Sequence, residues 1–148
     1  MWAFRLQPSI AKIFSRPNYP LFNPNTVVPA YSAAMHAKYE VMETAIRLNP
    51  FRTRFFCWLD VGLFRNLAGS GVNGSLFSLS LPPKLDTNAV AYSEVKRRIS
   101  GLSAKDIVVK NEYWVCGCFF VGRIDVLQLW IKEYKVGQYA AESRSYAN

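Results

Sequence analysis

Histidine and cysteine are scarce in this chain, and their scarcity limits the chemistry that it supports. One histidine, His36, and three cysteines occur among 148 residues. A nucleophilic cysteine would have to use His36 as its base, and the cysteine spacing is not that of a zinc ribbon. We therefore interpret Cys57, Cys116 and Cys118, which all lie in apolar runs, as buried free thiols of a reducing compartment.

Long apolar runs are missing as well. The longest lie around residues 55–64 and 113–122 and are bounded by charges, so neither reaches the roughly 18 residues of a membrane helix. A chain of 148 residues suits one domain with a buried core. We expect a soluble globular chain without a membrane span. Its high hydrophobic content of 51% favours self-association through apolar surface.

Acidic residues are few, with 10 against 18 basic residues and a net charge of +8. Solvated faces explain the scattered basic residues, and a basic surface that faces phosphates is the alternative. No zinc-finger spacing or RNP-type strand is present, so we predict no specific nucleic-acid partner. The basic residues near the middle of the chain and in its longest basic run are Arg47, Arg52, Arg54, Arg65 and 96–98.

The first 30 residues hold five of the eight prolines and no acid. We divide the chain into this proline-rich segment, in which residues 16–25 are expected to be extended with turns, and a single α/β domain over 31–148. Met1–Arg16 has the basic, acid-free character of a mitochondrial presequence, but a short helix before a proline-rich loop explains it equally well. We expect a cytoplasmic protein, with the mitochondrion as the minor alternative.

The clearest helix is expected over 30–48. Met35, Tyr39, Met42 and Ile46 lie on one face of a 3.6-residue period. A buried strand is expected over 54–59, and a second over 112–120. The alternation of helix and strand favours a partly parallel sheet. The remaining elements that we expect are a loop over 66–88 with a short edge strand at 75–81, a weak helix over 88–100, a strand over 105–110, and a helix over 125–135 that Gly137 ends.

The first strand ends at a candidate site. The apolar run 55–59 is followed at once by Asp60 and Gly62. An acid at the carboxyl end of a buried strand lies where open α/β sheets bind their ligands. The structural alternative is that Asp60 caps the next segment and that Gly62 allows a tight turn.

Two stretches resemble the HtrL/YibB-like family, a group placed near the glycosyltransferases. In the first, a lysine-bearing helix precedes Asn-Pro-Phe and an aromatic strand that ends Trp-(Ile/Leu)-Asp-x-Gly, with an arginine soon after. The second stretch is similar to the segment Ala-Gly-Gly-Phe-Phe-Gly-Gly, with Cys118 and Val121 where the family has glycines. The matching residues are Lys38, Asn49, Pro50, Phe51, Trp58, Leu59, Asp60, Gly62 and Arg65, then Gly117, Phe119, Phe120 and Gly122.

The resemblance covers about residues 20–140 and implies a partial GT-A-like mixed sheet with flanking helices. Family members are longer, with a nucleotide-binding first half, so the resemblance implies a truncated member. It also implies a glycosyltransferase-like protein that binds a nucleotide-sugar, with Mn²⁺ or Mg²⁺ as the metal. A catalytically inactive fragment or interaction module is the alternative.

The resemblance also assigns roles to single residues. It implies that Asp60 is the catalytic residue and the metal ligand. Asp125 and Glu112 are the candidates for a base. The substrate-binding residues that it implies are Lys38, Trp58, Gly62, Arg65, Gly117, Phe119 and Gly122.

Overall fold

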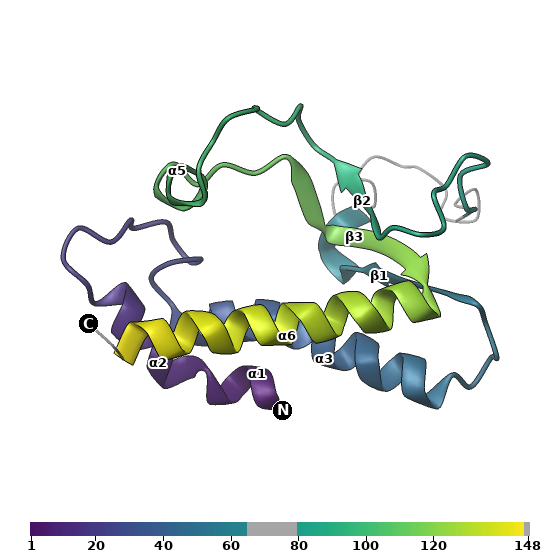
Figure 1. The fold of residues 1–148 in the computed structure, drawn as a ribbon, viewed down its shortest axis with the longest axis horizontal. Coiled ribbons are helices and arrows are strands. Elements are labelled where there is room, and N and C mark those ends of the chain that lie inside the picture. The colour runs from purple at the N-terminus through teal and green to yellow at the C-terminus, as the bar shows by residue number, and fades with distance from the viewer. Residues whose placement is uncertain (65–79, 147–148) are drawn as a thin grey trace.

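The computed structural model describes residues 1–64 and 80–146 and has the mixed α/β class that the sequence predicts (Figure 1). Two long helices, α3 (Pro29–Leu48) and α6 (Ile124–Tyr146), lie side by side against one face of a small sheet, and the short N-terminal helices pack on α3. The elements in chain order are α1 (Trp2–Arg5), α2 (Gln7–Phe14), α3 (Pro29–Leu48), β1 (Phe55–Leu59), the 3₁₀ turn η1 (Val61–Phe64), β2 (Ala91–Glu94), α5 (Ala104–Val109), β3 (Val115–Arg123) and α6 (Ile124–Tyr146).

The sheet has the order β1-β3-β2, and both pairs are antiparallel. Trp58 on β1 lies opposite Phe120 on β3, and Tyr92 on β2 lies opposite Phe120 from the other side. The expectation of a partly parallel sheet is therefore wrong for these strands. The segment between β2 and β3 returns the chain to the end of the sheet at which β2 stopped, and such a return gives an antiparallel pair.

The first predicted helix and the first predicted strand are confirmed, and the predictions for 88–100 and 105–110 are wrong. The helix expected over 30–48 is α3, and the strand expected over 54–59 is β1. The weak helix expected over 88–100 is replaced by β2, because Ala91 and Tyr92 pair with β3 and this pairing outweighs a poor helical pattern. The predicted edge strand at 75–81 lies almost wholly outside the described residues.

The strand expected over 105–110 is instead the helix α5. Its start carries a capping signal that the apolar run 107–109 obscures. The Ser103 hydroxyl accepts a bond from the Asp106 amide at 3.1 Å and donates one to the Asp106 carboxylate at 2.5 Å. The bond from the Ser103 hydroxyl to the carboxylate, followed by one from the Ser103 amide, lowers the pKa of Asp106. A serine three residues before an acid satisfies the free amides of a first helical turn.

Both ends of the described chain are helical. The helix predicted over 125–135 continues past Gly137 to Tyr146 as α6, because a glycine inside a helix costs only about 1 kcal/mol and does not by itself end it. Residues 1–16 form α1 and α2, which pack on α3 through Leu6, Ile10 and Ala33. The helices agree with the short-helix interpretation, and the presequence alternative stays a prediction. Within the described residues, no helix combines the length and the apolar character needed to cross a membrane.

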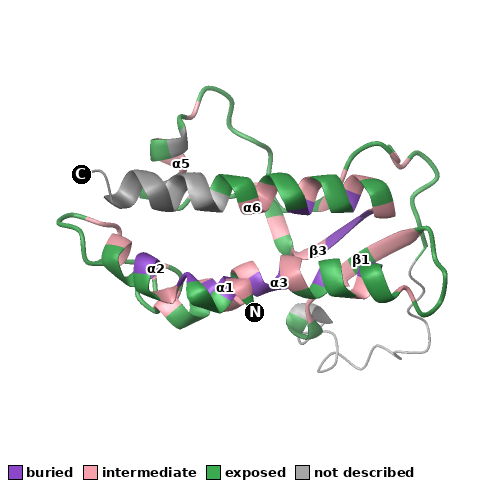
Figure 2. Ribbon diagram, turned by 60° about the horizontal axis from the view of Figure 1, so that its bottom comes forward, coloured by how far each residue is buried: buried purple, intermediate pink, exposed green. Residues whose placement is uncertain are grey.

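The main core lies where β3 meets the two long helices. Phe120 on β3 and Leu127 and Ile131 on α6 are almost completely buried, and Met42 and Ile46 of α3 close the cluster. Figure 2 shows the buried positions along β3 and on the facing sides of α3 and α6. The face of α3 predicted from its periodicity is the one that packs here, except that Met35 is exposed.

The cysteines contradict the interpretation of buried free thiols. Cys116 and Cys118 are joined by a disulfide, with their Cα atoms 5.1 Å apart. Alternate residues of a strand share a face, which lets two such side chains meet. Cys57 is free but exposed, because it lies on the side of β1 opposite Trp58, away from the helices.

Gly122 provides a test of the packing between β3 and α6. A Cβ atom at this position would lie 3.0 Å from Cγ of the fully buried Leu127. We expect Gly122→Ala to lower the free energy of unfolding by about 1–3 kcal/mol, because the overpacked core has little room to adjust. Urea unfolding followed by circular dichroism measures the loss.

Gly117, also on β3, is the matched control for this substitution. A Cβ atom at Gly117 would meet nothing within 4 Å. Gly117→Ala should leave stability unchanged or raise it by up to about 1 kcal/mol. Equal losses for the two variants would contradict a packing role for Gly122.

Candidate functional site

The Asp60 carboxylate, at the end of β1, is held from two sides. The Asp60 amide donates to the Cys118 carbonyl at 2.8 Å, which extends the pairing of β1 with β3 by one residue. The Trp58 indole N–H donates to Oδ1 at 2.6 Å, and the Lys38 ammonium lies 3.0 Å from Oδ2. Trp58 reaches this carboxylate because residues two apart share a face of the strand.

Lys38 comes from the middle of α3 and is the one charged residue that is buried in the described part of the chain. Its side chain is 10% exposed, against 34% for Asp60. The ammonium also donates to the Gly117 carbonyl at 3.0 Å and lies 5.6 Å from the centre of a Trp58 ring. A buried ammonium is tolerated only when its charge and its hydrogen bonds are matched, and here a carboxylate, a carbonyl and an aromatic face do so.

The Gly117 carbonyl is available to Lys38 because of an irregularity in β3. Tyr92 pairs with Phe120, but the next residue of β2, Ser93, pairs with Cys116. Residues 117–119 therefore form a bulge with no partner in β2. Bulges redirect the groups of a strand, and this one turns a backbone carbonyl toward the helix.

The other site residues predicted on β3 do not join this cluster. Phe119 lies beside Leu59 and lines the opposite face of the sheet from Trp58. Gly122 lies opposite Phe56, at the far end of β1, and its missing side chain makes room for Leu127. The structure therefore gives Gly122 a packing position, and its substrate-binding role stays a prediction.

Gly62 and Arg65 follow Asp60 in the chain. Gly62 is exposed in the 3₁₀ turn η1, directly after the cluster. Arg65 lies outside the described residues. Of the residues predicted to form the site, the structure brings together Lys38, Trp58, Asp60 and Gly117, and Gly62 adjoins them in sequence.

The two candidate bases are both engaged in ion pairs. Asp125 accepts two bonds from Arg123, at 2.6 and 2.7 Å, and the hydrogen bond to Arg123 lowers its pKa to about 2. Arg123 pairs with Phe55, so Asp125 adjoins the opposite end of β1 from Asp60, about 17 Å away along a five-residue strand. Glu112 lies 2.7 Å from the Lys96 ammonium. Neither residue is suited to act as a base beside Asp60.

The described residues do not fit the divalent metal that the resemblance implies. Among residues 1–64 and 80–146, no three histidine, cysteine or acidic side chains gather into a group that could hold a metal ion. Asp60 offers a single carboxylate, and the ammonium 3.0 Å from its Oδ2 occupies the place where a divalent cation would bind. Hard cations usually need several oxygen ligands, so we derive no chemistry through a metal here.

Sequence reasoning missed an apolar cavity of about 400 Å³ on the outer face of the sheet. Residues of all three strands and of the segment that leads into β2 line the cavity, so no single stretch of sequence indicates it. The alternation of β1, which places Phe55 and Cys57 on one side, is the only signal that could have suggested it. Its lining residues include Phe55, Cys57, Leu81, Leu85, Phe119 and Val121.

A second missed feature is a group of aromatic side chains between α3, α6 and β2. The ring centres of Tyr39 and Tyr134 are 4.0 Å apart, and the Tyr134 hydroxyl is hydrogen-bonded to His36 Nδ1. Burial raises the pKa of Tyr39 and of Tyr92 and lowers the pKa of His36. The helical period placed Tyr39 in the core, but only the fold brings its partners to it.

Comparison with known proteins gives no family for this chain: no family model, curated protein or solved structure matches it. The resemblance to the HtrL/YibB-like family therefore stays a prediction, and any functional proposal rests on the geometry of the site together with that resemblance.

The coupling between Lys38 and Asp60 is open to measurement. Asp60→Ala should cost about 2–3 kcal/mol of stability, because it leaves a buried ammonium without its counter-charge. The double variant Lys38→Met/Asp60→Ala should cost less than Asp60→Ala alone, since methionine removes the unmatched charge and keeps the side-chain volume. Urea unfolding of the single and double variants measures the coupling energy.

The pair Lys96–Glu112 is the control for this cycle. Its side chains are 45% and 22% exposed, and such pairs contribute less than about 1 kcal/mol. A Lys38–Asp60 coupling no larger than that of Lys96–Glu112 would contradict the structural role of the buried pair.

Proposed function

We propose that this chain is a glycosyltransferase-like protein of the HtrL/YibB-like type that binds the sugar of a nucleotide-sugar at Asp60. The observation that carries the proposal is the convergence of Lys38, Trp58 and Asp60 on one point at the end of β1. Lys38 and Trp58 are 22 and 2 positions away from Asp60 in sequence. They belong to the stretch in which the resemblance is most specific.

The fixed carboxylate is suited to bind hydroxyl groups. Each oxygen of an ionised carboxylate accepts more than one hydrogen bond, so Asp60 keeps acceptor capacity after binding Trp58 and Lys38. Its two oxygens are held in place before a ligand arrives, which reduces the ordering cost of binding. The side chain is one third exposed, so a ligand can reach it.

The charge balance of the site favours the sugar over the diphosphate. Lys38 and Asp60 neutralise each other, so the pair offers hydrogen bonds and no net charge. The diphosphate would require further cations, because phosphate groups pair with arginine and lysine. Arg65 is the residue that the resemblance implies for binding the diphosphate. Asp60 would bind the sugar, without a metal ion.

Thermal unfolding with a panel of UDP-, GDP- and CMP-sugars, each with and without Mn²⁺, tests this proposal. Ligand at a hundredfold excess over Kd stabilises a protein by about 2.7 kcal/mol, which raises Tm by about 5–10 °C for a chain of this size. We expect one class of nucleotide-sugar to raise Tm without Mn²⁺. Asp60→Asn should abolish the shift, measured against the unliganded variant.

Asp125→Asn is the control, because it removes an exposed aspartate at the opposite end of β1 and should leave the ligand-induced shift intact. A folded protein whose Tm responds to no member of the panel would refute nucleotide-sugar binding. A shift of the same size in Asp60→Asn would place the ligand elsewhere.

The alternative function is a non-catalytic interaction module. The apolar cavity on the outer face of the sheet favours it, as does the position of β1 and β2 at the two edges of the described sheet. Sheet edges and apolar surface are common sites of association with a second chain. A concentration-dependent mass in light scattering, together with a flat nucleotide-sugar panel, would favour this alternative over the transferase-like function.

A further inference from the structure

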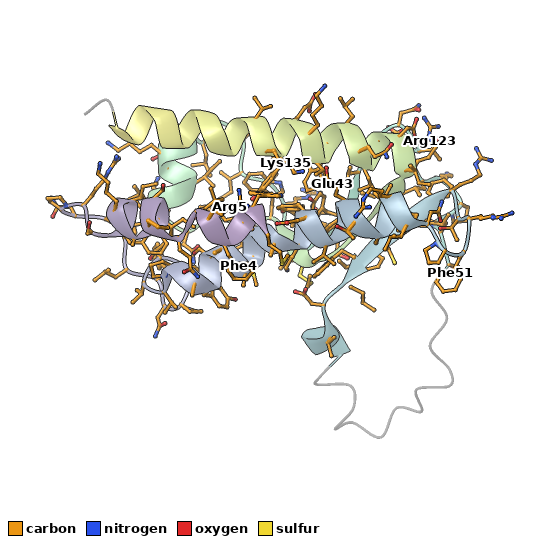
Figure 3. The ribbon with its side chains drawn as sticks, turned by 90° about the horizontal axis from the view of Figure 1, so that it is seen from below. Phe4, Arg5, Glu43, Phe51, Arg123 and Lys135 are labelled. Atoms are coloured by element: carbon orange, nitrogen blue, oxygen red, sulfur yellow. A yellow bond between two sulfur atoms is a disulfide. The ribbon has the colours of Figure 1, made fainter. Side chains whose placement is uncertain are left out.

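The turn between α3 and β1 places apolar side chains in solvent at one end of the molecule. Phe51 is 85% exposed, and Leu48, at the end of α3, is 66% exposed. We call residues 47–54 the Phe51 tip. Figure 3 shows Phe51 at the same end as Arg123 and far from Phe4 and Arg5 of the N-terminal helices. Two large apolar side chains in solvent on one turn form a candidate contact surface.

The exposure of Phe51 is built into the turn by hydrogen bonds. Asn49 adopts a left-handed conformation with φ 32°, and the chain turns again at Arg52 with φ 51°. The Asn49 side chain bonds to the Thr53 backbone in both directions, accepting from its amide at 2.9 Å and donating to its carbonyl at 3.1 Å. Asn49 therefore clamps the turn in the conformation that holds Phe51 outward.

Three arginines lie in the same turn as the exposed phenylalanine. Arg47, Arg52 and Arg54 are all exposed in the Phe51 tip. The neighbouring acid Asp125 is paired with Arg123, so this pair adds no net charge. Of the acids on α3, Glu43 is paired with Lys135 and Glu40 lies near the amino terminus. The tip thus combines an apolar centre with three arginine charges.

We propose that the Phe51 tip docks this protein on the surface of an anionic phospholipid bilayer. Phe51 and Leu48 would enter the interface between head groups and acyl chains, and the three arginines would pair with the lipid phosphates and the anionic head groups. A bilayer surface combines negative charge with an apolar layer directly beneath it, which is the complement of this tip. The binding is peripheral and independent of the site at Asp60.

The chemistry of the tip favours lipid over single-stranded nucleic acid. Nucleic-acid surfaces of this kind present successive aromatic rings on which bases stack. The tip has one aromatic ring, and its second apolar anchor is the aliphatic side chain of Leu48. An aliphatic side chain gains from contact with acyl chains but offers no stacking surface to a base.

Sedimentation with phosphatidylcholine vesicles, with and without phosphatidylserine, tests the proposal on the full chain. We expect binding to the phosphatidylserine vesicles only, weakened by salt. Arg47→Gln/Arg52→Gln/Arg54→Gln should weaken it about a hundredfold, at about fivefold for each arginine. Phe51→Ser should weaken it about tenfold or more through loss of the buried ring. Phe51→Trp should retain binding, since tryptophan favours the membrane interface.

The triple variant Lys84→Gln/Arg97→Gln/Lys105→Gln is the control for charge, because it removes three positive charges from exposed positions outside the tip. Leu21→Ser is the control for Phe51→Ser, because it removes an apolar side chain that is 78% exposed. Both should bind vesicles like the unaltered protein. Equal losses in the tip and control triple variants would reduce the effect to net charge and overturn the proposal. The proposal would also be overturned if the unaltered protein bound no vesicles. The same holds if the unaltered protein bound single-stranded RNA and the tip variants lost that binding instead.

Discussion

The fold depends on the burial of one strand, β3, against two helices. β3 is hydrogen-bonded to β1 on one side and to β2 on the other, and it leads without a loop into α6. Phe120 on its inner face is 1% exposed and packs with Leu127 and Ile131. Because the strand and the following helix share one core, the direction of α6 is tied to the sheet, and Gly122 permits their close approach at the corner.

The candidate site is supported by the same core. α3 buries Met42 and Ile46 against α6 and β3, and this packing carries Lys38 to the end of β1. The ion pair with Asp60 then joins the helix to the strand end. Site and fold are coupled here, because the residues that would bind a ligand also neutralise a buried charge. A change at Asp60 therefore has to be examined for stability before it is interpreted as a loss of function.

The two faces of the sheet have different surroundings, and this difference organises the rest of the surface. The inner face carries Trp58, Phe120 and Tyr92 and meets the helices. The outer face carries Cys57 and Phe119 and lines an apolar cavity. The Phe51 tip, in contrast, lies in the turn before the sheet, where hydrogen bonds from Asn49 hold it open to solvent. The inner face of the sheet, the outer cavity and the Phe51 tip therefore all include residues of the unit formed by α3, the turn and β1.

The sequence by itself determined the elements whose signals are local and strong. The 3.6-residue period predicted α3, and the apolar runs predicted β1 and most of β3, with Asp60 at the end of a strand. The family resemblance, and not a local signal, implied Lys38, Trp58 and Gly117 as site residues, and it did not show how they meet. Only the tertiary structure decided the antiparallel pairing, the strand at 91–94, the position of Gly122 in the core, and the cavity. These depend on contacts between residues far apart in the chain, and local propensity is too weak to specify such contacts.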